Sequence, residues 1–114
     1  MATQRRVTLT QLIGKSAVNA KSEFAGVNSY PDVGLQIETS AVLSGGVIAL
    51  RQTADNGAYN GQIIAEIAFP IADGTTFAAT SVAVSNIGTV VYAEITTALV
   101  GGTITKAFLT MQED

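Results

Sequence analysis

The sequence predicts an all-β fold, an antiparallel β-sandwich or barrel of about six or seven strands preceded by an irregular N-terminal arm. From Val33 onward, apolar and polar residues alternate, and Gly-Gly and Asn-Gly pairs interrupt the alternation every ten residues or so. Val, Ile and Thr, which favour strands over helices, recur throughout. The 114 residues fit one domain. We divide them into an arm or loop over residues 1–32 and an antiparallel β-domain over residues 33–114.

The first predicted strands lie between Val33 and Thr53. Val33, Leu35 and Ile37 alternate with small or polar residues, which is the pattern of a half-buried strand. Gly45-Gly46 separates this strand from the next one. The next strand covers residues 47–53 and carries Arg51 on its polar face. Residues 54–57 read Ala-Asp-Asn-Gly and predict a tight hairpin turn, since Asn and Gly tolerate positive φ.

Four more strands are predicted after this turn. Residues 59–72 form a long strand in which Pro70, which lacks an amide donor, marks an edge, a bulge or an end. Residues 75–87, 89–100 and 103–112 follow, with further Gly-containing turns predicted at 73–74, 86–88 and 101–102. In the strand at residues 59–72, the expected apolar face consists of Ile63, Ala65, Ile67, Phe69 and Ile71. In the strand at residues 89–100, it consists of Val91, Ala93, Ile95 and Leu99, with Tyr92 and Glu94 on the opposite face. In the last strand, Ile104 and Phe108 are expected on the face of Lys106.

The arm has no clear period. Val7–Ile13 is a candidate strand, and residues 16–24 contain alanines at loosely helical spacing among Ser and Asn. Two interpretations remain open for this segment: a disordered tail, or a segment that lies across a neighbouring subunit.

The charge content excludes several classes of function. Six basic residues are scattered along a chain of net charge −3, and only Arg5 and Arg6 are adjacent, so nucleic-acid binding is not expected. Met1–Thr10 is not a secretory signal, and the sequence lacks an apolar run long enough for a membrane span. Only 13% of residues are charged, about half the usual content of a soluble domain. A sheet with so few ionised side chains is expected to be covered partly by other chains, and we predict a homo-oligomer.

The residue types argue against an enzyme. The chain contains no histidine and no cysteine, so it lacks the commonest general base and the commonest metal ligands, and we expect no cofactor and no metal. Lys15 beside Ser16, and Lys21 beside Ser22, are weak candidates for a catalytic dyad. Glu66 and Glu94 are a candidate acid–base pair, although the favoured interpretation is that each lies on a solvent-facing sheet surface or pairs with Arg51 or Lys106 across strands.

A few residues are candidates for contacts with partners. Tyr59 and Tyr92 flank Arg51 in the predicted sheet, where they form either interface anchors or a stacking surface for sugars or bases. The predicted interface residues are Ile64, Val90, Tyr92, Tyr59 and Arg51.

Residues 49–59, followed by residues 62–70, resemble the strand–turn–strand centre of the coat proteins of single-stranded RNA phages, and residues 91–99 resemble the next strand. The resemblance implies a sheet that pairs between subunits in a shell. Two features depart from it: the chain ends twelve residues after Gly102, without the two C-terminal helices of that family, and it is less basic, so no RNA-binding residues are carried over. The composition, rich in Ala, Thr, Val and Gly, is also similar to that of phage head-decoration proteins.

The sequence therefore predicts a non-enzymatic structural protein of a virus particle, found in the virion, which forms or decorates a shell as a homo-oligomer. A major capsid protein or another virion protein is the other expected partner. The alternative is a carbohydrate- or peptide-binding β-sandwich module of a larger assembly.

Overall fold

The computed structural model describes residues 3–26, 32–53, 59, 61–71, 76–83 and 90–113. Of Thr3, Gln4, Gln112 and Glu113 it describes the backbone alone. The predicted turns at 54–57 and 86–88, and the Asp73-Gly74 turn, lie outside the described residues. The strands are β1 (Thr3–Thr8), β2 (Ala25–Gly26), β3 (Asp32–Thr39), β4 (Gly45–Thr53), β5 (Gln62–Phe69), β6 (Phe77–Ala83), β7 (Val90–Val100) and β8 (Ile104–Glu113), with a short 3-10 helix, η1 (Thr10–Leu12).

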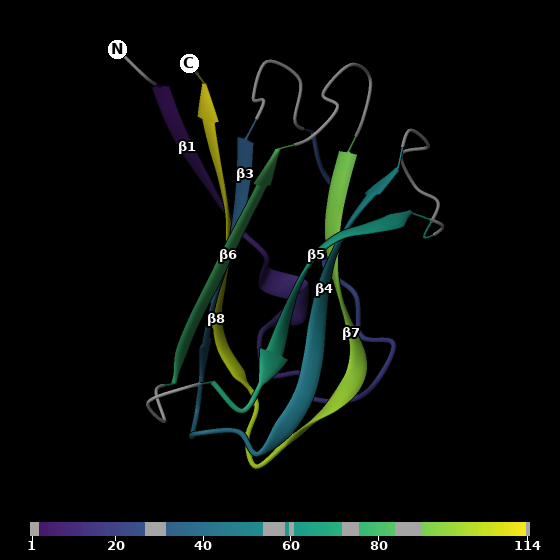
Figure 1. The fold of residues 1–114 in the computed structure, drawn as a ribbon, viewed down its shortest axis with the longest axis vertical. Coiled ribbons are helices and arrows are strands. Elements are labelled where there is room, and N and C mark those ends of the chain that lie inside the picture. Colours follow the sequence, from purple (N-terminus) through teal and green to yellow (C-terminus); the bar gives the residue numbers. More distant parts are fainter. Residues whose placement is uncertain are drawn as a thin grey trace.

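The strands form two antiparallel sheets of four strands each (Figure 1). The first sheet has the order β1-β8-β3-β6 and the second the order β2-β7-β4-β5. Successive strands alternate between the sheets, except that β4 and β5 are neighbours in the second sheet. This order is that of a jelly roll, in which two interleaved Greek keys form a sandwich. The predicted all-β sandwich is confirmed, with eight strands in place of six or seven.

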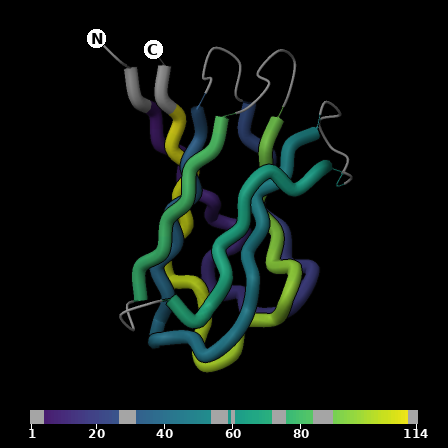
Figure 2. Tube along the Cα trace, viewed as in Figure 1, coloured from purple at the N-terminus to yellow at the C-terminus, as the bar shows by residue number. Residues whose placement is uncertain are grey.

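The core lies between the two sheets and is closed by the arm. Inward-facing side chains of both sheets pack together, and Leu9 and Leu12 from the segment around η1 are completely buried with them. The N-terminal segment is less irregular than predicted, because β1 pairs with β8 along its whole length. The start of β1 and the end of β8 therefore lie side by side at one end of the sandwich, and the coloured parts of the tube in Figure 2 run next to each other there.

The alternation in β7 follows the prediction, since Val91, Ala93 and Ile95 enter the core while Tyr92 and Glu94 lie on the opposite face. The predicted end of a strand near Pro70 is also confirmed, because β5 ends at Phe69.

Two predicted faces are wrong because strands contain irregularities. In β5, a register shift opposite Leu50 and Arg51 turns Ile63 outward, where it is 43% exposed, and packs Ile64 against the core. In β8, a shift near Thr39 buries Ile104, while Lys106 is exposed and Phe108 is half-buried. A bulge of one residue moves the following side chains to the other face of the strand.

Candidate functional site

The outer face of the β2-β7-β4-β5 sheet holds most of the polar and aromatic residues singled out from the sequence. Arg51 of β4 is the register partner of Tyr92 of β7, and Ala49 is the partner of Glu94. Because Val91, Ala93 and Ile95 face the core, Tyr92 and Glu94 project from the other side of the sheet. The structure thus brings Arg51, Tyr92 and Glu94 together on one face.

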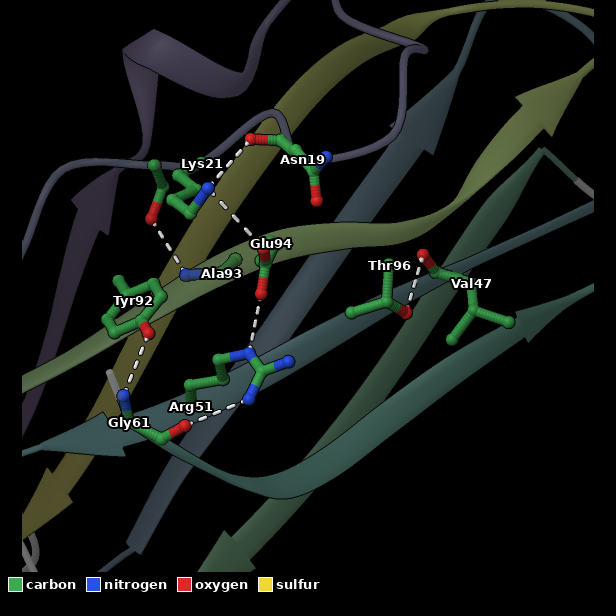
Figure 3. A network of polar contacts seen from close by, with 10 residues as sticks. Asn19, Lys21, Val47, Arg51, Gly61, Tyr92, Ala93, Glu94 and Thr96 are labelled. Atoms are coloured by element: carbon green, nitrogen blue, oxygen red, sulfur yellow. Dashed lines mark hydrogen bonds and ion pairs between the residues drawn. The ribbon is translucent and has the colours of Figure 1, made fainter. Parts of the chain in front are cut away.

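Glu94 is the centre of an ion-pair network (Figure 3). Its Oε1 accepts a hydrogen bond from Arg51 Nε at 2.5 Å, and its Oε2 lies 3.5 Å from Lys21 Nζ. Arg51 Nη1 also donates to the carbonyl oxygen of Gly61 at 2.9 Å, and Lys21 Nζ donates to that of Asn19 at 3.1 Å. Glu94 is only 8% exposed, and the burial of a carboxylate costs free energy unless cations and hydrogen-bond donors contact it, as they do here.

Three aromatic rings pack beside this network. Phe24 stacks on Tyr59 with ring centroids 4.7 Å apart, and Tyr92 contacts both rings edge-on at 5.3 and 5.1 Å. The Tyr92 hydroxyl accepts a hydrogen bond from the Gly61 amide at 3.0 Å, and the Tyr59 hydroxyl donates to the Ser22 carbonyl at 3.4 Å. Tyr92 is buried beneath the other two rings, whereas Tyr59 remains 47% exposed. We call Phe24, Tyr59 and Tyr92 the aromatic cluster.

The cluster and the ion pairs hold the N-terminal segment on the edge of β7. The amides of Asn19 and Ser22 donate to the carbonyls of Ile95 and Ala93, both at 2.8 Å, and Ile95 N donates to Ala20 O at 2.9 Å. The fully buried Ser22 hydroxyl accepts from the Ala93 amide at 2.8 Å and donates to Glu23 O. The sequence left two interpretations of this segment open, a disordered tail or a segment that lies across a neighbouring subunit. The structure shows instead that it pairs with the edge of the chain's own sheet.

Glu23 ties the same segment to η1. Its carboxylate accepts hydrogen bonds from the amides of Thr10 and Gln11 at 3.1 and 3.2 Å, and from the Thr10 hydroxyl at 2.7 Å. Burial acts to raise the pKa of Glu23, but hydrogen bonds from its own backbone, from the Thr10 hydroxyl and from these two amides outweigh it, so the pKa lies below its usual value.

Three of the groups considered for catalysis, Lys21, Ser22 and Glu94, have partners within the fold. The Lys21 ammonium contacts Glu94 and Asn19, while the Ser22 hydroxyl bonds Ala93 and Glu23, so these neighbours face different groups. Glu66 and Glu94 lie on the same face on either side of Ala49, but Glu66 is exposed and Glu94 is bound to two cations. Within the described residues, no group of three or more acidic, His or Cys side chains is placed to hold a metal ion.

The five predicted interface residues do not share one open surface. Ile64 packs against the core, Val90 is half-buried, Tyr92 is 1% exposed and Arg51 is held by Glu94. Tyr59 presents the largest free surface of the five. The structure brings Tyr59, Tyr92 and Arg51 together and adds Phe24 and Lys21 from the arm, which sequence reasoning did not join to them. The one available signal was an aromatic residue in a segment without a clear period.

A second surface lies at the end of the sandwich opposite the chain termini, at the bottom of Figure 1. Residues 13–19, 40–45 and 98–103 meet there through backbone hydrogen bonds such as Leu99 N to Ser16 O and Ser44 N to Val100 O. Four large apolar side chains in these segments are exposed, at 38% for Ile13, 48% for Val18, 50% for Val42 and 54% for Val100. Lys15 is the single charged residue in the three segments. We call this surface the neutral end.

The sequence matches no protein-family model and no curated protein. Solved structures share the fold. A prophage protein, SPBc2 prophage-derived YomS, superposes with a TM-score of 0.60 at 10% identity, covering 99% of this chain and 96% of its own. The CBM36-1 domain of a multidomain xylanase from the hindgut metagenome of Trinervitermes trinervoides gives 0.63 at 12% identity, covering 96% of each chain.

A carbohydrate binding module from a Cellvibrio mixtus lichenase, solved with cellotriose, gives a TM-score of 0.53 at 14% identity, covering 97% of this chain and 86% of its own. In the described part of the chain, no helix is both long enough and apolar enough to span a membrane. At these identities the likeness concerns the fold alone: this chain is a jelly-roll sandwich like those of a prophage protein and of carbohydrate-binding modules.

Proposed function

We propose that the protein is a non-enzymatic structural component of a phage particle, which assembles with copies of itself to form or to cover a shell. The observation that carries this proposal is the neutral end, where three neighbouring segments expose four large apolar side chains and contain one charged residue, Lys15. Monomeric proteins rarely gather exposed apolar residues in this way, and the cores of protein interfaces are depleted in charge.

Two further points support the proposal. The jelly roll is an architecture that viral shells use, and YomS, a prophage-derived protein, has this fold over its whole length. The full sequence also offers no histidine or cysteine for the common catalytic and metal-binding chemistries. The virion is the proposed location, and a major capsid protein is the proposed second partner.

The mass of the purified protein in solution tests the proposal. By light scattering at micromolar concentration, we expect a mass greater than that of one chain. Val100→Lys places a charge at the neutral end on the most exposed of its apolar residues, and it should lower the assembled mass without changing the unfolding transition. Gln62→Lys, on an exposed position of β5 outside the neutral end, is the matched control and should leave the mass unchanged. A wild-type protein of single-chain mass at every concentration would contradict the proposal.

A carbohydrate-binding module is the second candidate, favoured by the exposed ring of Tyr59 beside Lys21 on a sheet face. The packing of the aromatic cluster argues against this candidate. Phe24 already stacks on the Tyr59 ring and Tyr92 is buried, so little aromatic surface remains for a sugar to stack on. Titration calorimetry with soluble β-glucans and xylans would test it. Binding that is lost in Tyr59→Ala and kept in Phe77→Ala, which alters an exposed ring on the other sheet, would favour this candidate over the structural one.

A further inference from the structure

The two sheets have four edges, and three of them carry features that oppose pairing with another strand. The β1 edge contains the adjacent cations Arg5 and Arg6. The β5 edge carries the irregularity at Ile64 and the exposed Glu66. The edge beyond β7 is broken into the two-residue β2 and an isolated bridge at Lys21. Charges, bulges and short strands are the means by which proteins protect sheet edges.

The fourth edge, β6, lacks all of these features. Its sequence, FAATSVA, has no charge and no proline, and it pairs with β3 over all seven residues without a register shift. Among the described strands, β3 is the sole hydrogen-bonded neighbour of β6. A straight, uncharged edge of this length is suited to accept a further strand.

The hydrogen bond just before the start of β6 shows which of its residues bond to β3 and which point away from it. The Thr39 amide donates to the Thr76 carbonyl at 2.9 Å, and the register continues from Glu38–Phe77 to Asp32–Ala83. Since hydrogen-bonded and non-hydrogen-bonded pairs alternate along an antiparallel ladder, Ala78, Thr80 and Val82 exchange bonds with β3. The amides and carbonyls of Ala79, Ser81 and Ala83 therefore point away from β3, toward the edge at which no other described strand pairs.

We propose that β6 pairs with β6 of a second copy, antiparallel about a two-fold axis at Thr80, so that the β1-β8-β3-β6 sheet continues from one subunit into the next. The inference rests on the proposed self-assembly and adds to the neutral end a second contact surface between copies. Such an axis places Ala79 opposite Ser81 of the partner subunit, and both residues direct their backbone groups toward the shared edge, as a hydrogen-bonded pair requires. Thr80 then faces Thr80 of the partner subunit as a non-hydrogen-bonded pair.

The side chains of β6 are compatible with this symmetry. On the outer face, the half-exposed Phe77 lies opposite Ala83 of the partner subunit, so a large side chain meets a small one. Ser81 and Ala83 also border a hollow of about 440 Å³ on this part of the sheet, which offers room beside the partner ring. No two like charges meet across the axis, because β6 carries none. An isologous contact needs a surface that complements itself in this way.

A disulfide across the proposed axis tests the pairing directly. The chain contains no cysteine, so Thr80→Cys introduces a single thiol. Cα atoms of a non-hydrogen-bonded antiparallel pair lie about 4.5 Å apart, which is within the range that a disulfide spans. Mild oxidation should yield a covalent dimer as the main product, seen on a non-reducing gel. Thr8→Cys, exposed on β1 at the other edge of the same sheet, should remain a single chain. Equal cross-linking of both variants, or none at Thr80→Cys, would overturn the proposal.

A proline at the open edge gives an independent test. The Ser81 amide points away from β3, so Ser81→Pro removes a donor to the partner while keeping the ladder within the subunit. Two symmetric hydrogen bonds are lost, and we expect dimer affinity to fall about tenfold or more with the thermal unfolding transition retained.

Thr8→Pro is the matched control for this variant. Because Leu9 N donates to Ala107 O, the amide of Thr8 also points to an open edge, that of β1, and its loss should leave dimer affinity unchanged. A wild-type oligomer that neither Ser81→Pro weakens nor Thr80→Cys cross-links would overturn the β6 contact and leave the proposed self-assembly standing. A wild type of single-chain mass would overturn both.

Discussion

At the scale of single residues, Glu94 joins the N-terminal segment to the sheet. It is a nearly buried carboxylate with one cation from β4 and one from the arm, Arg51 and Lys21. The sequence left three interpretations open for Glu94, a solvent-facing position or a pair with Arg51 or with Lys106 across strands, and the structure shows the pair with Arg51. The contribution of Lys21 was not predictable, since it depends on backbone pairing between residues 19–22 and β7 that leaves no periodic pattern.

Removal of the Glu94 carboxylate should destabilise the fold measurably. We expect Glu94→Ala to lower the free energy of unfolding by about 1–3 kcal/mol, since it leaves two partly buried cations without their shared partner. Glu66→Ala, on the same face beyond Ala49 but exposed, should cost no more than about 0.5 kcal/mol. Urea unfolding of both variants measures the difference, and equal losses would show that the ion pairs contribute little.

At the scale of secondary-structure elements, sequence alternation predicted the strands well and their faces only where they are regular. β7 keeps an undisturbed register with β4 from Val90 to Ile95, so its faces were assigned correctly. In β5 the register shift opposite Arg51 turns Ile63 outward and Ile64 toward the core, the reverse of the predicted faces. Alternation in the sequence does not show where such a bulge lies. The arm escaped recognition for another reason: η1 and β2 are short and are held by tertiary hydrogen bonds.

The attachment of η1 through Glu23 should depend on pH. The folded-state pKa of Glu23 is lowered, so its stabilising effect is fully present above the pKa of the unfolded chain and is lost as the pH falls through the folded-state pKa. Glu23→Gln should therefore lower the free energy of unfolding at neutral pH, by about 0.5 kcal/mol because the carboxylate is partly solvated. In acid below both pKa values, the variant and the wild type should have equal stability. Denaturant unfolding across this pH range measures the gap, and a gap independent of pH would exclude the charge as its cause.

At the scale of the whole molecule, the N-terminal segment determines whether the sandwich is complete. Residues 3–24 supply β1, the fully buried Leu9 and Leu12, and the backbone pairing at the edge of β7. The low charge content predicts a surface partly covered by other chains, which stays a prediction, and it could not locate the exposed apolar side chains. The neutral end arises only when segments far apart in the sequence meet at one end of the jelly roll.

Deletion of residues 1–24 distinguishes an arm that completes its own subunit from one that reaches a neighbour. Burial of each leucine contributes about 1.5–3 kcal/mol, and the deletion also exposes the edge of β8 and opens the core. Since domains of this size have only about 5–15 kcal/mol of stability, we expect the shortened chain to lose its cooperative unfolding transition in circular dichroism. Deletion of Met1 and Ala2 alone should leave the transition in place. A shortened chain that folds normally but fails to assemble would instead show that the segment acts between subunits.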